Sequence, residues 1–151
     1  MAAPAPFDVD PVIAHLRAQV SGLRDVAGSA DFATAVASTT PVVPAAYVLL
    51  ASERANASAG AAGIAVQSIQ VRFAVVVACR SYRVAERGMN ASAELRDLVG
   101  QVRSALLGRT PPGFIAGQAQ SVDLVSGALL SYSSATLWWQ EIYSTTYWSR
   151  T

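Results

Sequence analysis

Residues 64–80 read IAVQSIQVRFAVVVACR, and this stretch decides the fold of the 151-residue chain. In its first half polar and apolar residues alternate, which is typical of a strand with one exposed face. The second half, from Phe73 to Cys79, is apolar at every position and predicts burial on both faces. We therefore expect a long strand over Ile64–Arg80 whose first half is partly exposed and carries Gln70 and Arg72.

The segment before this strand supplies a partner for it. Ala45–Ser52 is an apolar run that follows Pro41 and Pro44, and it predicts a second buried strand. Glu53–Gly63 is small, polar and too long for a tight hairpin turn, so we interpret it as a loop that is available for contacts. Its only basic residue is Arg54, and the two strands would form a long antiparallel hairpin.

The N-terminal segment predicts a helix and a short strand. Asp10-Pro11 is a typical helix start, because Asp accepts unpaired amide hydrogens and Pro lacks the hydrogen that would be unpaired. Apolar residues follow at helical spacing, so we expect a helix over Pro11–Leu23 after an arm formed by residues 1–9. In the mixed segment that follows, we expect a short strand at either Asp25–Gly28 or Thr34–Ala37.

A second helix is predicted over Asn90–Leu107. Its apolar residues form a single stripe, and Arg96 and Arg103 belong to the polar side that we expect to face solvent. Asn90 or Ser92 would cap its start, and Gly108 would end it in a left-handed conformation.

The C-terminal third is rich in strand-forming residues. Gln120–Val125, Ala128–Ser133 and Ala135–Thr146 predict three strands, separated by Gly127 and a serine-rich bend. Trp138 and Trp139 are neighbours on the last strand and therefore face opposite ways. One would fill the core, and the other would lie either under a further part of the chain or at a contact with another protein.

Together these elements predict one domain over residues 1–151. The order of helix, strands, helix and strands favours an α+β fold: an antiparallel sheet with two main helices packed on one face.

Composition excludes several classes of protein. The chain has eleven arginines, no lysine and ten carboxylates, and a formal charge of +1 argues against a protein that coats nucleic acid. Charged residues make up 14%, against about 25% in an average soluble domain, so we expect other subunits to cover part of the surface. No apolar run approaches the ~20 residues that span a bilayer, and the start does not resemble a secretory signal.

Residues with catalytic chemistry are few and scattered. His15 is the lone histidine, and Cys79 ends an apolar strand, where a buried small hydrophobe is a better interpretation than a nucleophile. The carboxylates lack metal-ligand spacing, and the glycines and serines form no phosphate loop or nucleophile elbow. We expect no enzyme, no cofactor and no metal site.

Four segments form a combined pattern in order and spacing. The first is the helix after Phe7-Asp-Val-Asp, and the second is Pro44-Ala-Ala-Tyr-Val-Leu-Leu-Ala with the Glu53 loop. The third is Gln70-Val-Arg-Phe-Ala-Val-Val-Val, which leads to the helix that contains Leu95-Arg-Asp-Leu-Val and Ala105-Leu-Leu-Gly. The fourth is Leu137-Trp-Trp-Gln-Glu-Ile-Tyr-Ser-Thr. Together they resemble the tail terminator proteins of long-tailed bacteriophages, especially the Mu-like group. The resemblance covers about Phe7 to Trp148.

This resemblance implies a structural virion protein without a catalytic site or cofactor. Such a protein forms a hexameric ring on the head-proximal end of the tail tube, stops tube growth and presents an attachment surface to the head connector. Its partners would be further copies of itself, the tube protein and a head-completion or connector protein. DNA would only pass through the lumen, no membrane would be involved, and assembly would occur in the host cytoplasm.

Within this resemblance we expect contacts with the tube or a neighbouring subunit at eight residues: Arg54, Asn56, Gln70, Arg72, Arg96, Arg103, Trp138 and Trp139. The turn over Gly108–Gln118 is a further candidate. Solvation or a local ion pair is the alternative for each arginine. Two other functions stay open, namely another head–tail joining protein (a tail-completion or connector subunit) and a small dimeric ligand-binding domain.

Overall fold

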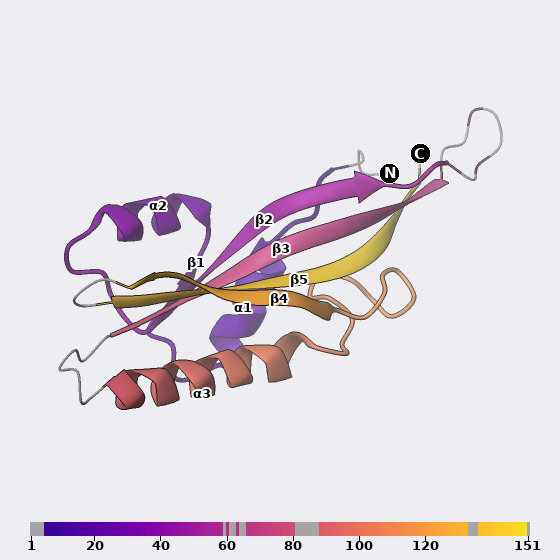
Figure 1. The fold of residues 1–151 in the computed structure, drawn as a ribbon. Coiled ribbons are helices and arrows are strands. Elements are labelled where there is room, and N and C mark those ends of the chain that lie inside the picture. Colours follow the sequence, from indigo (N-terminus) through magenta and orange to yellow (C-terminus); the bar gives the residue numbers. More distant parts are fainter. Residues whose placement is uncertain are drawn as a thin grey trace.

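The computed structural model describes residues 5–58, 60, 63, 66–80, 88–132 and 136–150, with the side chains of 88–92, 132 and 150 left aside. These residues form three helices and five strands (Figure 1). In chain order they are α1 (Asp10–Gln19), β1 (Asp25–Ala27), α2 (Ser29–Ala37), β2 (Ala45–Ala55), β3 (Val66–Arg80), α3 (Gly88–Leu106), β4 (Asp123–Tyr132) and β5 (Thr136–Arg150).

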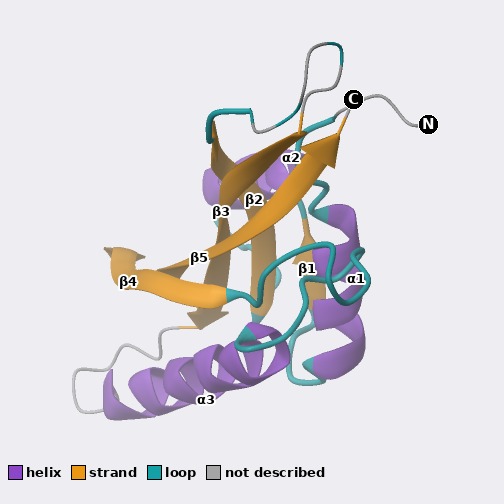
Figure 2. Ribbon diagram, turned by 90° about the vertical axis from the view of Figure 1, so that its right-hand side faces the viewer, coloured by secondary structure: helices purple, strands orange, loops and turns teal. Residues whose placement is uncertain are grey.

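The five strands form one sheet in the order β1-β2-β3-β5-β4. β1 runs parallel to β2, and every other neighbouring pair is antiparallel. Figure 2 shows β4 and β1 at the two edges of this sheet. The pairing of β3 with β5 is continuous over 15 residues, from Val66 opposite Arg150 to Arg80 opposite Thr136. At ~3.4 Å per residue, these two strands are about 50 Å long.

Helices cover both faces of the inner part of the sheet, because alternate residues of β3 point to opposite sides. Val75 and Val77 face a large core that α1 and α3 cover, which confirms two main helices on one face. Val76 and Ala78 face a smaller core on the other side, beneath α2. Figure 1 shows α2 on one side of the sheet and α1 and α3 on the other.

The third helix was not predicted from the sequence. Asp25–Ala27 is the expected short strand, whereas Thr34–Ala37, the alternative, belongs to α2. The α2 helix has nine residues and only Ala35 is buried among them, so it lacks a strong apolar stripe. The α1 helix ends at Gln19, four residues before the predicted end, and Val20 then packs into the core.

Partner strands set the observed lengths of β2 and β5. β2 continues to Ala55, so Glu53 and Arg54 belong to a strand rather than to the predicted loop, because β3 pairs with them. β5 likewise extends past Thr146 to Arg150, opposite the first half of β3. The predicted start at Ile64 lies outside the described residues.

Two further boundaries differ from prediction. The two strands predicted around Gly127 are one continuous strand, β4, whose pairing with β5 carries it across the glycine. The ends predicted at Ser133 and Ala135 lie outside the described residues. The α3 helix begins at Gly88, so Asn90 and Ser92 lie inside the helix and do not cap it. Gly108 has φ +73°, as expected of a left-handed helix end.

The described part of the N-terminal arm packs onto the outer part of the sheet. Phe7 is buried, and its ring stacks on Phe73 and Phe114 with centroids 5.6 and 5.8 Å apart. Tyr147 of β5 also contacts this cluster, at 6.3 Å from Phe7. Four segments distant in sequence therefore share one aromatic core under the arm.

The α2 helix is held to its face of the sheet by a second aromatic cluster. Phe32 lies 5.6 Å from Tyr47 and 6.0 Å from Trp138, measured between ring centroids. Tyr47 and Trp138 are themselves 6.3 Å apart. Since Ala35 is the buried residue of α2, Phe32 supplies most of the remaining apolar contact that fixes the helix.

We expect Phe32→Ala to lower the free energy of unfolding by about 2 kcal/mol, less than for a fully buried phenylalanine because Phe32 is only partly buried. Urea unfolding followed by tryptophan fluorescence measures this change. Val36→Ala is the control: Val36 lies on the same helix, its side chain is 56% exposed, and its loss should cost within about 0.5 kcal/mol. Equal effects of the two substitutions would contradict this account of α2.

Candidate assembly surfaces

Three strands project beyond the helices at the end of the sheet where Ala55 and Val66 lie, which we call the outer end (Figure 1). The structure brings four of the predicted contact residues together there. Arg54 lies opposite Gln70, and Arg72 lies two pairs further along the same two strands, opposite Ser52. All three are exposed and share the sheet face on which α2 lies. Asn56 follows β2 and is hydrogen-bonded to Ser68 at 2.7 Å.

On the opposite face of the outer end, Glu53 of β2 links the N-terminal arm to β5 through hydrogen bonds. Its carboxylate accepts hydrogen bonds from the backbone N–H of Phe7 and from the Tyr147 hydroxyl, which is 3.2 Å from each carboxylate oxygen. Burial, and then the negative charge of Glu53, raise the pKa of Tyr147 to about 12. The arm, β2 and β5 are thus joined through one carboxylate.

A buried ion pair ties α3 to the sheet. Glu141 is fully buried on β5, and Arg103 binds it through two nitrogens, with Nη2 2.9 Å from Oε2. The indole N–H of Trp139 donates to Oε2 at 3.0 Å, and the Tyr143 hydroxyl donates to Oε1 at 3.3 Å. The hydrogen bonds to Glu141 raise the pKa of Arg103, so the guanidinium stays charged.

The prediction that Arg103 faces solvent holds only in part: 39% of its side chain is exposed, but its guanidinium binds Glu141. It reaches toward the sheet and satisfies the only fully buried carboxylate of the described residues, which is the local ion pair considered as the alternative. Sequence analysis missed Glu141, although a single acidic residue inside the aromatic strand LWWQEIY is the signal that points to it. Arg96 lies on the exposed side of α3, as predicted.

Gly127 makes room for this ion pair. It lies opposite Glu141 in the β4–β5 register. A Cβ at this position would lie 2.4 Å from Oε2 of Glu141 and 2.9 Å from the Trp139 ring. The glycine that the sequence presented as a break between strands is instead the place where β4 passes directly over a buried carboxylate.

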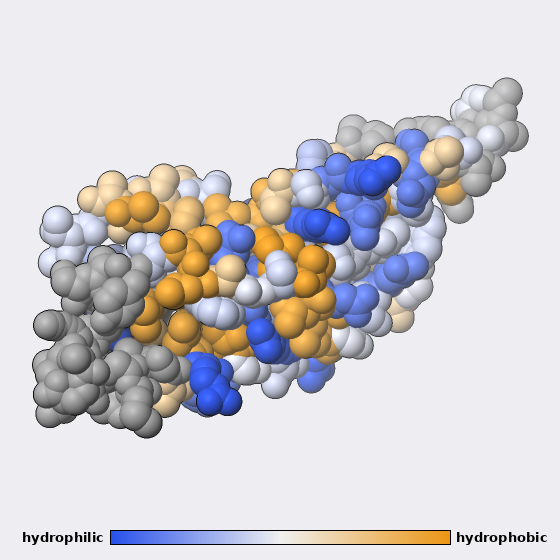
Figure 3. Space-filling view, in the orientation of Figure 1, coloured by the Kyte–Doolittle hydropathy of each residue, from blue (hydrophilic) through white to orange (hydrophobic). Residues whose placement is uncertain are grey.

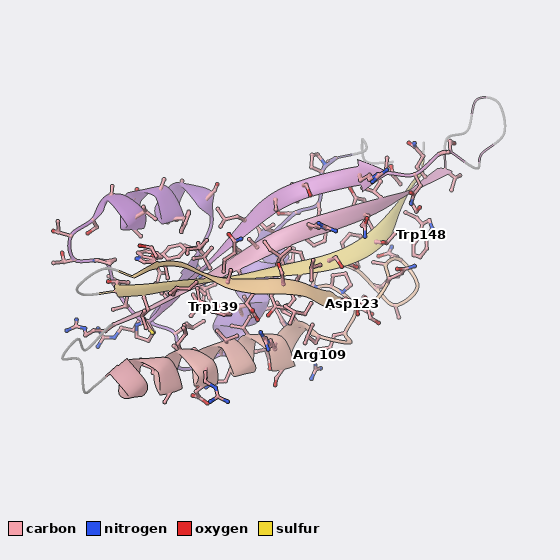
Figure 4. All side chains as sticks on the ribbon, viewed as in Figure 1. Arg109, Asp123, Trp139 and Trp148 are labelled. Atoms are coloured by element: carbon pink, nitrogen blue, oxygen red, sulfur yellow. The ribbon has the colours of Figure 1, made fainter. Side chains whose placement is uncertain are left out.

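The two predicted tryptophans do face opposite ways. Trp138 is 8% exposed and packs under α2, so its side chain offers little surface to a partner. Trp139 is partly buried toward α3, beside a groove of about 280 Å³ that Leu95, Val99 and Arg103 also line. Trp148, which was not predicted as a contact, is 47% exposed near the outer end of β5 (Figure 4).

The edge strand β4 carries exposed apolar side chains and no charge after Asp123. Val125, Leu129 and Leu130 are 42%, 52% and 47% exposed. Figure 3 shows hydrophobic side chains gathered over β4 and over part of α2. Val36 on α2 and Val42 in the segment that joins α2 to β2 are also exposed. In the turn over residues 108–118, Phe114 anchors the chain while Ile115 is 70% exposed. An exposed apolar edge strand is a common site of contact with another protein.

The described residues show no constellation for catalysis by metal or thiol. No group of three or more His, Cys, Asp or Glu among them is placed to bind a metal ion. The Cys79 thiol is buried, and burial together with the charge of Glu94 raises its pKa to about 11, which keeps it protonated. His15 lies 2.9 Å from the carbonyl oxygen of Ala105 and links α1 to α3. No helix in the described part of the chain is long and apolar enough to cross a membrane.

The strands of the outer end project beyond the helices, and β4 has an exposed apolar edge; both features suit a structural subunit of a larger assembly. Residues 2–151 match the family model described as Phage tail terminator protein, and the chain belongs to this family. It is therefore a structural component of the phage tail and of the virion, not an enzyme; its family stops tail tube growth and joins the tail to the head. No curated protein matches the chain in a sequence comparison.

We expect Gly127→Ala to lower the free energy of unfolding by about 1–3 kcal/mol, because the added methyl group displaces Glu141 or Trp139. The matched control is Gly100→Ala on α3, where a Cβ meets nothing within 4 Å and the substitution should stabilise by about 0.5–1 kcal/mol. Chemical denaturation measures both. A neutral Gly127→Ala variant would show that the carboxylate has room to move.

Tyr147 should make stability depend on alkaline pH. Its pKa is raised from about 10 to about 12, so its contribution is complete below pH ~10 and is lost as pH rises through ~12. We expect Tyr147→Phe to flatten this fall in the free energy of unfolding, measured by denaturant titrations across that range. The variant retains Tyr143, whose pKa burial also raises, so part of the slope should remain. An unchanged slope would contradict the role of the Glu53 contact.

Proposed function

We propose that six copies of this chain form a closed ring on the head-proximal end of the tail tube. The ring ends tube growth, leaves a lumen through which DNA passes, and presents its other side to the head-completion or connector protein. Assembly takes place in the host cytoplasm. The order and spacing of the four segments quoted above further support a place in the Mu-like group.

The observation that carries the ring is the position of the exposed apolar side chains. A closed ring requires a head-to-tail contact between two different surfaces of the same chain. Val125, Leu129 and Leu130 lie on β4 at one sheet edge, while Val36 lies on α2 and Val42 in the segment that joins α2 to β2. Two separate apolar surfaces on a chain with 14% charged residues fit such a contact.

We assign the tube contact to the outer end. Asn56, Gln70 and Arg72 form an exposed polar surface on and beside the strands that project beyond the helices. Polar side chains on a rigid pair of strands suit recognition of a separate protein that must be bound in one orientation. Arg96, on the exposed side of α3, remains a candidate for the wall of the ring.

In lysates of a phage that lacks this chain, the tail tubes should be longer than normal, because the tube keeps polymerising when its end is not capped. These tubes should also not be joined to heads. Electron microscopy of lysates measures the tube length distribution. Expression of the wild-type chain from a plasmid should restore the normal length and the joined heads.

The same images separate the other head–tail joining function. Loss of a connector or completion subunit leaves tails of normal length without heads, and that result would contradict the proposed terminator ring. A chain that remains a compact dimer in solution and is missing from purified tails would favour the small dimeric ligand-binding domain instead.

A further inference from the structure

We infer that the first half of β4, residues 123–127, of one copy pairs antiparallel with residues 48–52 of β2 of the next copy, so that the sheet continues from subunit to subunit. This inference rests on the proposed ring and adds a strand-to-strand contact between neighbouring copies.

Both strands present a free sheet edge in the described residues. β1 pairs only with Ala45–Tyr47 of β2, so the rest of β2 pairs with β3 alone. β4 pairs with β5 alone. The backbone groups on the outer side of each strand therefore have no strand partner within the subunit, and such an edge binds another strand readily.

Strand direction matches the two edges. The four long strands alternate in direction in the order β2-β3-β5-β4, so β2 and β4 run in opposite directions. Copies in a ring share one orientation relative to the ring axis. When strands run roughly along that axis, β4 of one copy therefore meets β2 of the next in the antiparallel sense.

The register places matching side chains at one level. Leu124 lies opposite Tyr143, which lies opposite Phe73, which lies opposite Leu50. Leu124 and Leu50 thus occupy the same level and the same face at the two edges. Leu50 is 38% exposed although it faces the main core side, which fits an apolar group that a neighbouring Leu124 covers.

Charge is complementary at the next pair. Asp123 lies at the level of Ser52, through Ser144 and Arg72, and it is exposed at the end of β4 (Figure 4). Arg54 lies two residues beyond Ser52 on the same face and is also exposed. A diagonal cross-strand pair of this kind lies at about 7–8 Å between Cα atoms, within reach of an arginine. The single acid of β4 would therefore meet the arginine of the neighbour's β2.

Both edges also bend at this level. The register shifts between Leu50 and Ser52 in β2, and between Leu124 and Ser126 in β4. A bulge protects an edge by twisting it away from a straight partner. In the proposed register the two shifts lie on adjacent pairs, on either side of the level that Leu50 and Leu124 share.

Cysteine cross-linking in purified tails tests the pairing. Leu50→Cys and Leu124→Cys are introduced into separate chains and expressed together during infection by phage that lacks its own copy of the gene. After oxidation, non-reducing gels should show a dimer band for the mixture and none for either variant alone. A chain with both substitutions should give a ladder, because two intervening strands keep the two cysteines of one chain about 14 Å apart.

The matched control replaces Leu50→Cys by Leu49→Cys, which lies one residue away on the opposite face and should not cross-link to Leu124→Cys. Dimers of Leu124→Cys alone would indicate a two-fold contact and overturn the pairing. A cross-link to the tube protein would show that the tube occupies this edge, and would overturn it too. Absence of any cross-link in tails of normal length would overturn the pairing and leave the proposed ring intact, whereas overlong tails with the wild-type chain would overturn the ring.

A charge exchange decides the matter if the cysteine variants do not assemble. Asp123→Arg and Arg54→Asp should each reduce the yield of normal-length tails by about tenfold, and the double variant should restore most of it. Single and double variants of equal yield, or a double variant with the product of the two losses, would overturn the pairing.

Discussion

The structure depends on the uninterrupted pairing of β3 with β5. Fifteen residues of each strand lie opposite one another, and β3 carries Val76 toward one core and Val77 toward the other. Because these two strands are longer than the helices that cover them, the domain has an enclosed inner part and a projecting outer part. The two strands proposed to join neighbouring copies are both positioned by this central pair: β2 with its free edge on one side, and β4 on the other.

Local sequence signals predicted the elements with strong periodicity. The alternation around Phe73 and the apolar run to Cys79 predicted β3, and the stripe through Leu98 and Val102 predicted α3. Local sequence did not predict where β2 and β5 end, because pairing with β3 sets the lengths of these strands. The residues around Arg54 and Tyr147 carry no local pattern that indicates this pairing. The α2 helix was not predicted for a different reason. Its contact with the sheet depends on Phe32 and Ala35 and not on a continuous apolar stripe.

The candidate surfaces were predictable only in part. Exposed polar residues at alternate positions, such as Gln70 and Arg72, follow from strand periodicity. The free edge of β2 does not, since it requires the knowledge that β1 ends at Ala27 and covers only three residues. Glu141 was also missed, because a helical position such as Arg103 reads as solvent-facing until the strand beneath it is placed. Both the free edge of β2 and the burial of Glu141 depend on the order of the strands in the sheet, which no single segment of the sequence encodes.

The close approach of β4 to the buried carboxylate has an evolutionary consequence. No side chain fits at position 127 while Glu141 keeps its place, and Arg103 has no other described acidic partner within reach of a salt bridge. Drift at any of the three sites is therefore constrained by the other two. Family members with a larger residue at position 127 should therefore have replaced both the acid and the arginine. Apolar side chains would then stand in place of the buried ion pair under α3.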